Sequence, residues 1–88
     1  MYFIVTYDIA DEYRLNKVRK ILRKYFNWVQ NSVFEGEISE AKLEKCIYEL
    51  KLVIKEDEDS IYFYKIENKK GLEKRIIGIS KNLTDNIL

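Results

Sequence analysis

The chain has 88 residues, of which 47% are hydrophobic and 35% are charged, and its formal net charge is +1, so it is sized for one small domain. It contains no histidine, which excludes histidine acid–base catalysis, histidine-activated nucleophiles and histidine-ligated zinc, and leaves only metals that prefer oxygen. A single cysteine excludes an internal disulfide. The absence of a signal-peptide pattern and of an apolar run of about 20 residues predicts a cytoplasmic protein that does not enter a membrane.

Charge is unevenly distributed along the chain. Residues 1–34 carry a net charge of +3, residues 35–59 carry −5, and residues 60–88 carry +3. Such a chain can present one basic face to a nucleic acid, but solvated lysine-rich helices explain the same distribution. Charge alone favours the second interpretation.

The first third of the chain predicts a strand and then a helix. Residues 2–9 are rich in β-branched and aromatic residues on both alternating faces, which is typical of a strand covered on both sides. Asp11 is suited to cap a helix over about residues 12–26. The apolar stripe of this helix consists of Leu15, Val18, Leu22 and Tyr25.

The remaining elements follow from the same signals. Residues 28–36 read as extended, and the pair Asn31-Ser32 predicts a bulge or a tight bend between two short strands. Ser39 is suited to cap a second helix over about residues 40–54, beside whose stripe Cys46 is interpreted as a small core residue. Strands are predicted over 60–67 and 75–79, with turns at 56–60 and 68–71.

This order of elements predicts an α+β sandwich of ferredoxin-like βαββαβ type with an additional C-terminal strand. The predicted domain spans residues 1–78, and residues 79–88 form a tail. Two helices can cover only one face of the sheet. Because the first strand is apolar on both faces, we expect the open face to pack against a second copy in a symmetric homodimer.

Asp8 is the unusual residue of the first strand. A carboxylate ending a buried strand must be paired, solvated or bound to a metal, or it simply ends the strand and helps to cap the following helix. In a dimer whose twofold axis passes nearby, two Asp8 carboxylates would repel each other unless a divalent cation joined them. The aromatic residues 62–64 are interpreted as core and dimer interface rather than as a surface for stacking bases.

Three segments carry a family resemblance. They are YDI at 7–9, VQNSVFEG at 29–36 and DSIYFY at 59–64. In this order and spacing they resemble the CRISPR-associated Cas-two family, small endoribonucleases that partner the spacer-acquisition integrase. The resemblance runs from about Phe3 to Glu67. Some relatives carry an arginine at or next to the position of Leu15, to which Arg14 and Lys17 lie close.

The resemblance implies a homodimer that holds Mg²⁺, or alternatively Mn²⁺, through Asp8, and a tail strand at 79–88 that joins the partner's sheet. One implied function is metal-dependent cleavage of single-stranded RNA or double-stranded DNA during spacer acquisition, with Asp8 on the metal and Tyr7 and Ser32 positioning the substrate. The alternative is a non-catalytic scaffold that bridges integrase dimers and binds DNA. A third possibility, a stand-alone RNA-binding or regulatory domain, needs an open sheet face. The residues expected to bind nucleic acid are Arg14, Lys17, Arg19 and Lys20.

Overall fold

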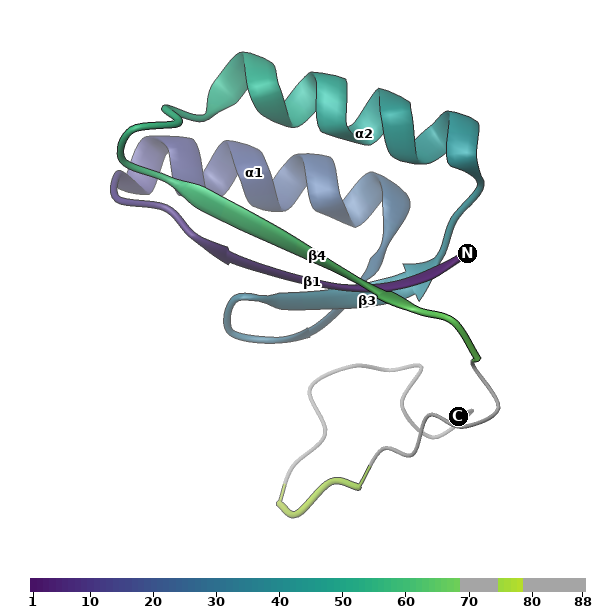
Figure 1. The fold of residues 1–88 in the computed structure, drawn as a ribbon. Coiled ribbons are helices and arrows are strands. Elements are labelled where there is room, and N and C mark those ends of the chain that lie inside the picture. Colours follow the sequence, from purple (N-terminus) through teal and green to yellow (C-terminus); the bar gives the residue numbers. More distant parts are fainter. Residues whose placement is uncertain (69–74, 79–88) are drawn as a thin grey trace.

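A computed structural model describes residues 1–68 and 75–78 of the chain, and within these residues a pair of helices packs on one side of a four-stranded sheet (Figure 1). The strand order is β2-β3-β1-β4, and all neighbouring strands are antiparallel. This is the predicted ferredoxin-like βαββαβ arrangement. The elements in chain order are β1 (Tyr2–Asp8), α1 (Glu12–Tyr25), β2 (Asn27–Gln30), β3 (Val33–Glu37), α2 (Glu40–Val53) and β4 (Ser60–Ile66).

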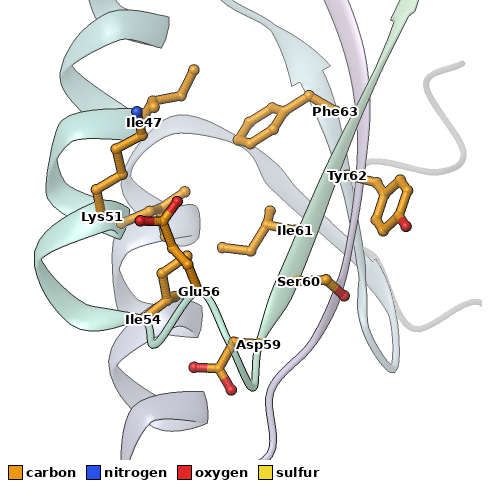
Figure 2. A pocket seen from close by; sticks show the side chains of 10 residues that line it. Ile47, Lys51, Ile54, Glu56, Asp59, Ser60, Ile61, Tyr62 and Phe63 are labelled. Carbon is orange, nitrogen blue, oxygen red and sulfur yellow. The ribbon is translucent and has the colours of Figure 1, made fainter.

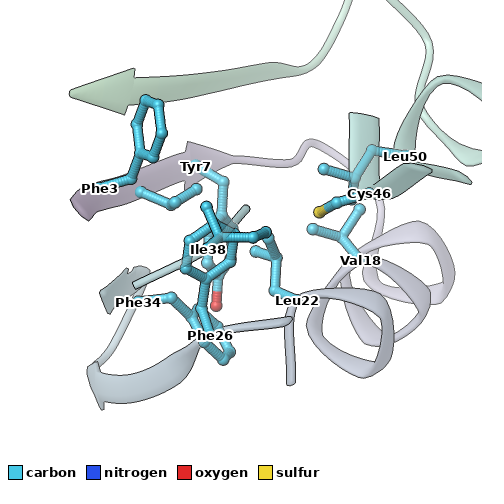
Figure 3. Close-up of a cluster of buried hydrophobic side chains, with 10 residues drawn as sticks. Phe3, Tyr7, Val18, Leu22, Phe26, Phe34, Ile38, Cys46 and Leu50 are labelled. Carbon is cyan, nitrogen blue, oxygen red and sulfur yellow. The ribbon is translucent and has the colours of Figure 1, made fainter. Parts of the chain in front are cut away.

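The core lies between β1, β3 and the two helices (Figure 3). Side chains alternate across β1, so that Phe3, Val5 and Tyr7 face the helices. Both predicted helical stripes supply buried residues, and burying each large aliphatic side chain contributes roughly 1.5–3 kcal/mol. The largest fully buried side chains are Val5, Val18, Leu22, Phe34 and Cys46.

The prediction that Cys46 is a core residue is confirmed. Its side chain has no exposed surface, and burial raises the pKa of its thiol to about 12. A thiol with this pKa remains protonated at neutral pH, whereas a nucleophilic cysteine acts as the thiolate.

Both helices begin at the predicted residues because their caps are formed as expected. The Asp11 carboxylate accepts a hydrogen bond from the backbone N–H of Arg14 at 2.9 Å, and the Ser39 hydroxyl accepts one from Lys42 at 3.3 Å. Between the two helices, the Glu49 carboxylate of α2 accepts hydrogen bonds from Lys24 and Tyr25 of α1. These bonds tie the two helices together, and the bond to Glu49 raises the pKa of Tyr25 to about 12.

The polar pair Asn31-Ser32 forms the predicted bend between β2 and β3. Asn31 has φ 38°, in the left-handed region that asparagine tolerates better than most residues. The pairing of β2 with β3 shifts register between Trp28 and Gln30. The segment therefore contains an irregularity in its strand pairing and then a tight bend, so both predicted features occur in succession.

The C-terminal strand predicted over 75–79 is not formed by residues 75–78. This stretch has strand-forming residues, but a strand also needs a neighbour for its backbone hydrogen bonds. Ile77 is 95% exposed, so its side chain packs on no other element. Residue 79 and the predicted tail, 79–88, lie outside the described residues, as do residues 69–71 of the predicted turn.

Candidate active site at the end of the first strand

Asp8 is the last residue of β1, and its Cα lies opposite that of Ser60, the first residue of β4. Alternation along β1 places Tyr2, Ile4, Thr6 and Asp8 on the sheet face away from the helices. The Asp8 side chain is exposed. The interpretation that Asp8 caps α1 is wrong, because Asp11 makes the capping hydrogen bond.

A second aspartate, Asp59, lies beside this strand end and is fully buried. One oxygen accepts hydrogen bonds from the backbone N–H of Ala10 at 2.9 Å and from Arg14 Nη2 at 3.1 Å. The other accepts from Arg14 Nε at 2.8 Å and from the backbone N–H of Lys55 at 2.9 Å. Asp59 therefore joins the β1–α1 connection, α1 and the turn before β4. Figure 2 shows its side chain at that turn.

The Arg14 guanidinium, with two backbone N–H groups, holds the pKa of Asp59 well below its usual range. Asp59 in turn raises the pKa of Arg14. The Arg14 side chain is 13% exposed and also contacts Glu58 at 3.4 Å. The guanidinium that was expected to contact phosphates thus forms a largely buried ion pair within the protein.

Tyr7 and Ser32 lie together through a backbone contact. The backbone N–H of Tyr7 donates to the Ser32 carbonyl at 3.2 Å, and the Tyr7 hydroxyl donates to the Asn31 carbonyl at 3.2 Å. Arg19 Nε donates to the same hydroxyl at 3.3 Å. The Tyr7 ring is buried in the core on the helix side of β1 (Figure 3), so this group and the Asp8 side chain are on opposite faces of the sheet.

Lys17 and Lys20 differ from Arg14 and Arg19, because both lysines are exposed on α1. Lys17 Nζ lies 4.7 Å from the centre of the Tyr13 ring, within cation–π range. The four basic residues expected to bind nucleic acid therefore form two pairs. Two are held by other side chains and two are open to solvent.

The donor set at this end of the sheet limits how a metal can bind. Within residues 1–68 and 75–78, no group of three or more cysteine, aspartate or glutamate side chains is arranged to hold a metal ion. The oxygens of Asp59 already accept four hydrogen bonds, whereas Asp8, the one carboxylate of β1, is exposed. Because Mg²⁺ usually keeps several waters and binds one or two carboxylates, a single exposed carboxylate fits a water-rich site and does not fit an all-protein cage.

The two sides of β4, the strand that pairs with β1 up to Asp8, present different surfaces. On the face away from the helices, Tyr62 and Tyr64 are 57% and 52% exposed, and their rings stack with centres 6.1 Å apart. On the other side of β4, a groove of about 420 Å³ runs between this strand and α2 (Figure 2). Ile61 and Phe63 point toward the groove, whereas Tyr62 points away from it.

The Asp59–Arg14 pair has little signal in the sequence. Asp59 belongs to the DSIYFY segment, and Arg14 is a neighbour of Leu15, but the two residues are 45 positions apart in the chain.

Neither helix among the described residues has the length and apolar composition needed to cross a membrane.

The fold and the exposed carboxylate at the end of β1 define a small ferredoxin-like α+β protein. The family model for CRISPR associated protein Cas2 matches residues 1–74, and the chain belongs to this family. It is 63% identical over 87 residues to the CRISPR-associated endoribonuclease Cas2 3 of Thermodesulfovibrio yellowstonii, covering 99% of this chain and 98% of that protein. It is 48% identical to the CRISPR-associated endoribonuclease Cas2 of Dictyoglomus turgidum, with both chains fully covered.

Solved structures agree with this assignment. A Cas2 crystal structure superposes with a TM-score of 0.80 at 43% identity, covering 92% of this chain and 90% of that one. The Cas2 structure from Streptococcus pyogenes gives a TM-score of 0.74 at 34% identity, covering 85% and 99% of the two chains.

Proposed function

We propose that the chain is a metal-dependent endoribonuclease that acts as a homodimer, with one Asp8 from each protomer at a shared Mg²⁺ or Mn²⁺ site. The observation that carries the proposal is the exposed Asp8 carboxylate at the end of a central strand whose other residues are buried or half-buried. Relatives that match nearly the whole chain bear the name endoribonuclease, which supports the same activity.

The homodimer is supported by the sheet face away from the helices. Ile4, Tyr62 and Tyr64 lie on this face, on two adjacent strands in register. Large exposed aromatic side chains on a flat sheet are typical of a protein interface. Packing two such faces around a twofold axis would bring the two Asp8 carboxylates toward each other, where a divalent cation would offset their repulsion.

When bound, the metal would supply a more acidic water and stabilise negative charge on the phosphate. The protein's own residues hold the metal, fix the neighbouring bend and attract the nucleic acid. Asp8 binds the metal, and the hydrogen bonds from Tyr7 to Asn31 and Ser32 fix the β2–β3 bend beside the strand end. Lys17 and Lys20 attract the phosphate backbone without reading its sequence.

A second candidate function is that of a DNA-binding scaffold which bridges integrase dimers during spacer acquisition. The exposed lysines of α1 favour it, because they suit contacts with duplex phosphates and need no metal. In this function Asp8 would be dispensable.

The experiment that separates these functions compares the wild type with Asp8→Ala. Cleavage of single-stranded RNA and of duplex DNA is measured with Mg²⁺, with Mn²⁺ and with chelator, and spacer acquisition is measured in cells. The proposed nuclease loses metal-dependent cleavage in Asp8→Ala and keeps it in Glu44→Ala, which removes an exposed carboxylate on α2. Cleavage unchanged by Asp8→Ala would refute the nuclease, and acquisition that persists without cleavage would favour the scaffold.

A further inference from the structure

The backbone of Asp8 is supported from one side only. β1 pairs with β3 from Tyr2 to Thr6, but it pairs with β4 as far as Asp8. At Asp8 the β-ladder therefore continues only through Ser60, and it ends there.

Directly beyond this last pair, the Asp59 carboxylate holds the backbone that follows Asp8. Asp59 precedes Ser60, and it accepts a hydrogen bond from the backbone N–H of Ala10, two residues after Asp8. The stretch from Asp8 to Ala10 is thus held at one end by the β-ladder and at the other end by Asp59. Asp59 is itself fixed, because Arg14 of α1 and the backbone of Lys55 bind the same carboxylate.

Asp59 is also the carboxylate that would first be considered as a second metal ligand, since it lies next to the partner of Asp8 in the ladder. Its contacts argue against that role. Each of its oxygens already accepts two hydrogen bonds, and its side chain has no exposed surface. A metal ion would have to displace a guanidinium and two backbone N–H groups to bind there.

We infer that Asp59 is a positioning residue that fixes the direction of the Asp8 carboxylate through Ala10, with Arg14 as its counter-ion, and that it binds neither metal nor RNA. The inference rests on the proposed function, in which Asp8 binds the metal. Removing a residue that orients a metal ligand without itself binding the metal typically lowers metal affinity by about 10–100-fold.

The test measures Mn²⁺ affinity by electron paramagnetic resonance on the full-length wild type and on Asp59→Asn, together with kcat and KM for RNA cleavage. We expect the dissociation constant for Mn²⁺ to rise about 10–100-fold and kcat to fall, with KM for RNA little changed. The matched control is Glu49→Gln, which also breaks a carboxylate link between two elements but lies on the helix layer. It should lower the unfolding temperature and leave Mn²⁺ affinity unchanged.

If Asp59→Asn does not fold, Arg14→Lys serves instead, since it keeps the positive charge and loses the paired geometry of the guanidinium. A smaller rise in the Mn²⁺ dissociation constant is then expected. Mn²⁺ affinity equal to that of the wild type in a folded variant with a lowered unfolding temperature would overturn the inference, because Asp59 would then be merely structural.

A measurement that needs no metal separates this inference from the proposed function. If the wild type binds no Mn²⁺, the proposed metal site at Asp8 is refuted. NMR order parameters of the metal-free protein then test whether Asp59 positions Asp8. Lower order parameters at Asp8 and Ile9 in Asp59→Asn, with Val18 unchanged, would support it. Equal order parameters at Asp8 and Ile9 in both proteins would refute it.

Discussion

Tyr7 and Asp8 are consecutive residues whose side chains lie on opposite faces of β1. The Tyr7 ring is buried under the helices, and its hydroxyl is bonded to Asn31 and Arg19. Asp8 is exposed on the other face. Within one protomer the tyrosine therefore fixes the β2–β3 bend, whereas Asp8 is the residue to which the proposed function assigns the metal.

Tyr7→Phe should consequently separate stability from activity. The variant loses the hydrogen bonds of one hydroxyl and keeps the ring, so we expect the free energy of unfolding to fall by about 1 kcal/mol. RNA cleavage should fall by less than about tenfold, which corresponds to about 1.4 kcal/mol in the activation barrier. Urea unfolding and single-turnover cleavage measure the two quantities. Asp8→Asn should show the reverse pattern, with normal stability and no cleavage, and a Tyr7→Phe variant that is inactive but stable would restore a catalytic role for the hydroxyl.

The two helices and the four strands of the sheet are predictable from the sequence to within a residue or two, whereas the strand predicted over 75–79 is not formed by residues 75–78. Their apolar spacing is local information, and the caps Asp11 and Ser39 mark where each helix begins. The face of β1 that the helices cover is not predictable, because both faces of that strand are apolar. The family resemblance groups Tyr7 and Asp8 as one site, although alternation along a strand places their side chains on opposite faces.

The Asp59–Arg14 pair escapes sequence-based prediction for a different reason. The chain has 16 basic and 15 acidic residues, and no local pattern marks which of them will be buried together. The pair forms only when β4 lies beside β1 and brings the turn before it onto α1. Burial then converts an ordinary surface charge into a structural contact.

Acid should weaken the contribution of Asp59 to stability. Its pKa in the folded protein is lowered, chiefly by Arg14, so the stabilisation is complete above the unfolded pKa of about 3.9 and is lost as the pH falls toward the folded value. At pH 7, Asp59→Asn should lower the free energy of unfolding by about 3–5 kcal/mol, because it leaves the largely buried Arg14 without its counter-ion. Urea unfolding of both proteins between neutral pH and about pH 3 should show this difference narrowing as the pH falls.

Glu49 requires a control in that experiment, because Lys24 and Tyr25 lower its pKa as well. Repeating the titration in a Glu49→Gln background removes this second source of acid sensitivity. A difference in stability between the wild type and Asp59→Asn that stays constant with pH would contradict the assignment of the charged pair.

The tyrosines of β4 provide a test of the homodimer. Tyr62 and Tyr64 stack on the face away from the helices, and charging both in a Tyr62→Lys, Tyr64→Lys double variant should raise the dimer dissociation constant at least about 100-fold. Sedimentation equilibrium at micromolar concentrations measures it. The matched control is Tyr48→Lys with Leu52→Lys, since these residues are similarly exposed on α2. A wild type that is monomeric at these concentrations, or a control that dissociates as readily, would contradict the proposed interface.

The salt dependence of DNA binding distinguishes the exposed Lys17 and Lys20 of α1 from Arg14, which is paired with Asp59. Each phosphate contact contributes about 0.9 to the slope of log K against log salt for duplex DNA, so a Lys17→Gln, Lys20→Gln double variant should lose about 2 from this slope. Arg14→Gln should lower stability and leave the slope unchanged, because its guanidinium is bound to Asp59. Fluorescence anisotropy at several salt concentrations measures the slopes, with Lys42→Gln, Lys45→Gln on α2 as the matched control. A slope that falls for Arg14→Gln, and not for the two lysines, would mean that DNA binding breaks the Asp59 pair and recruits the arginine.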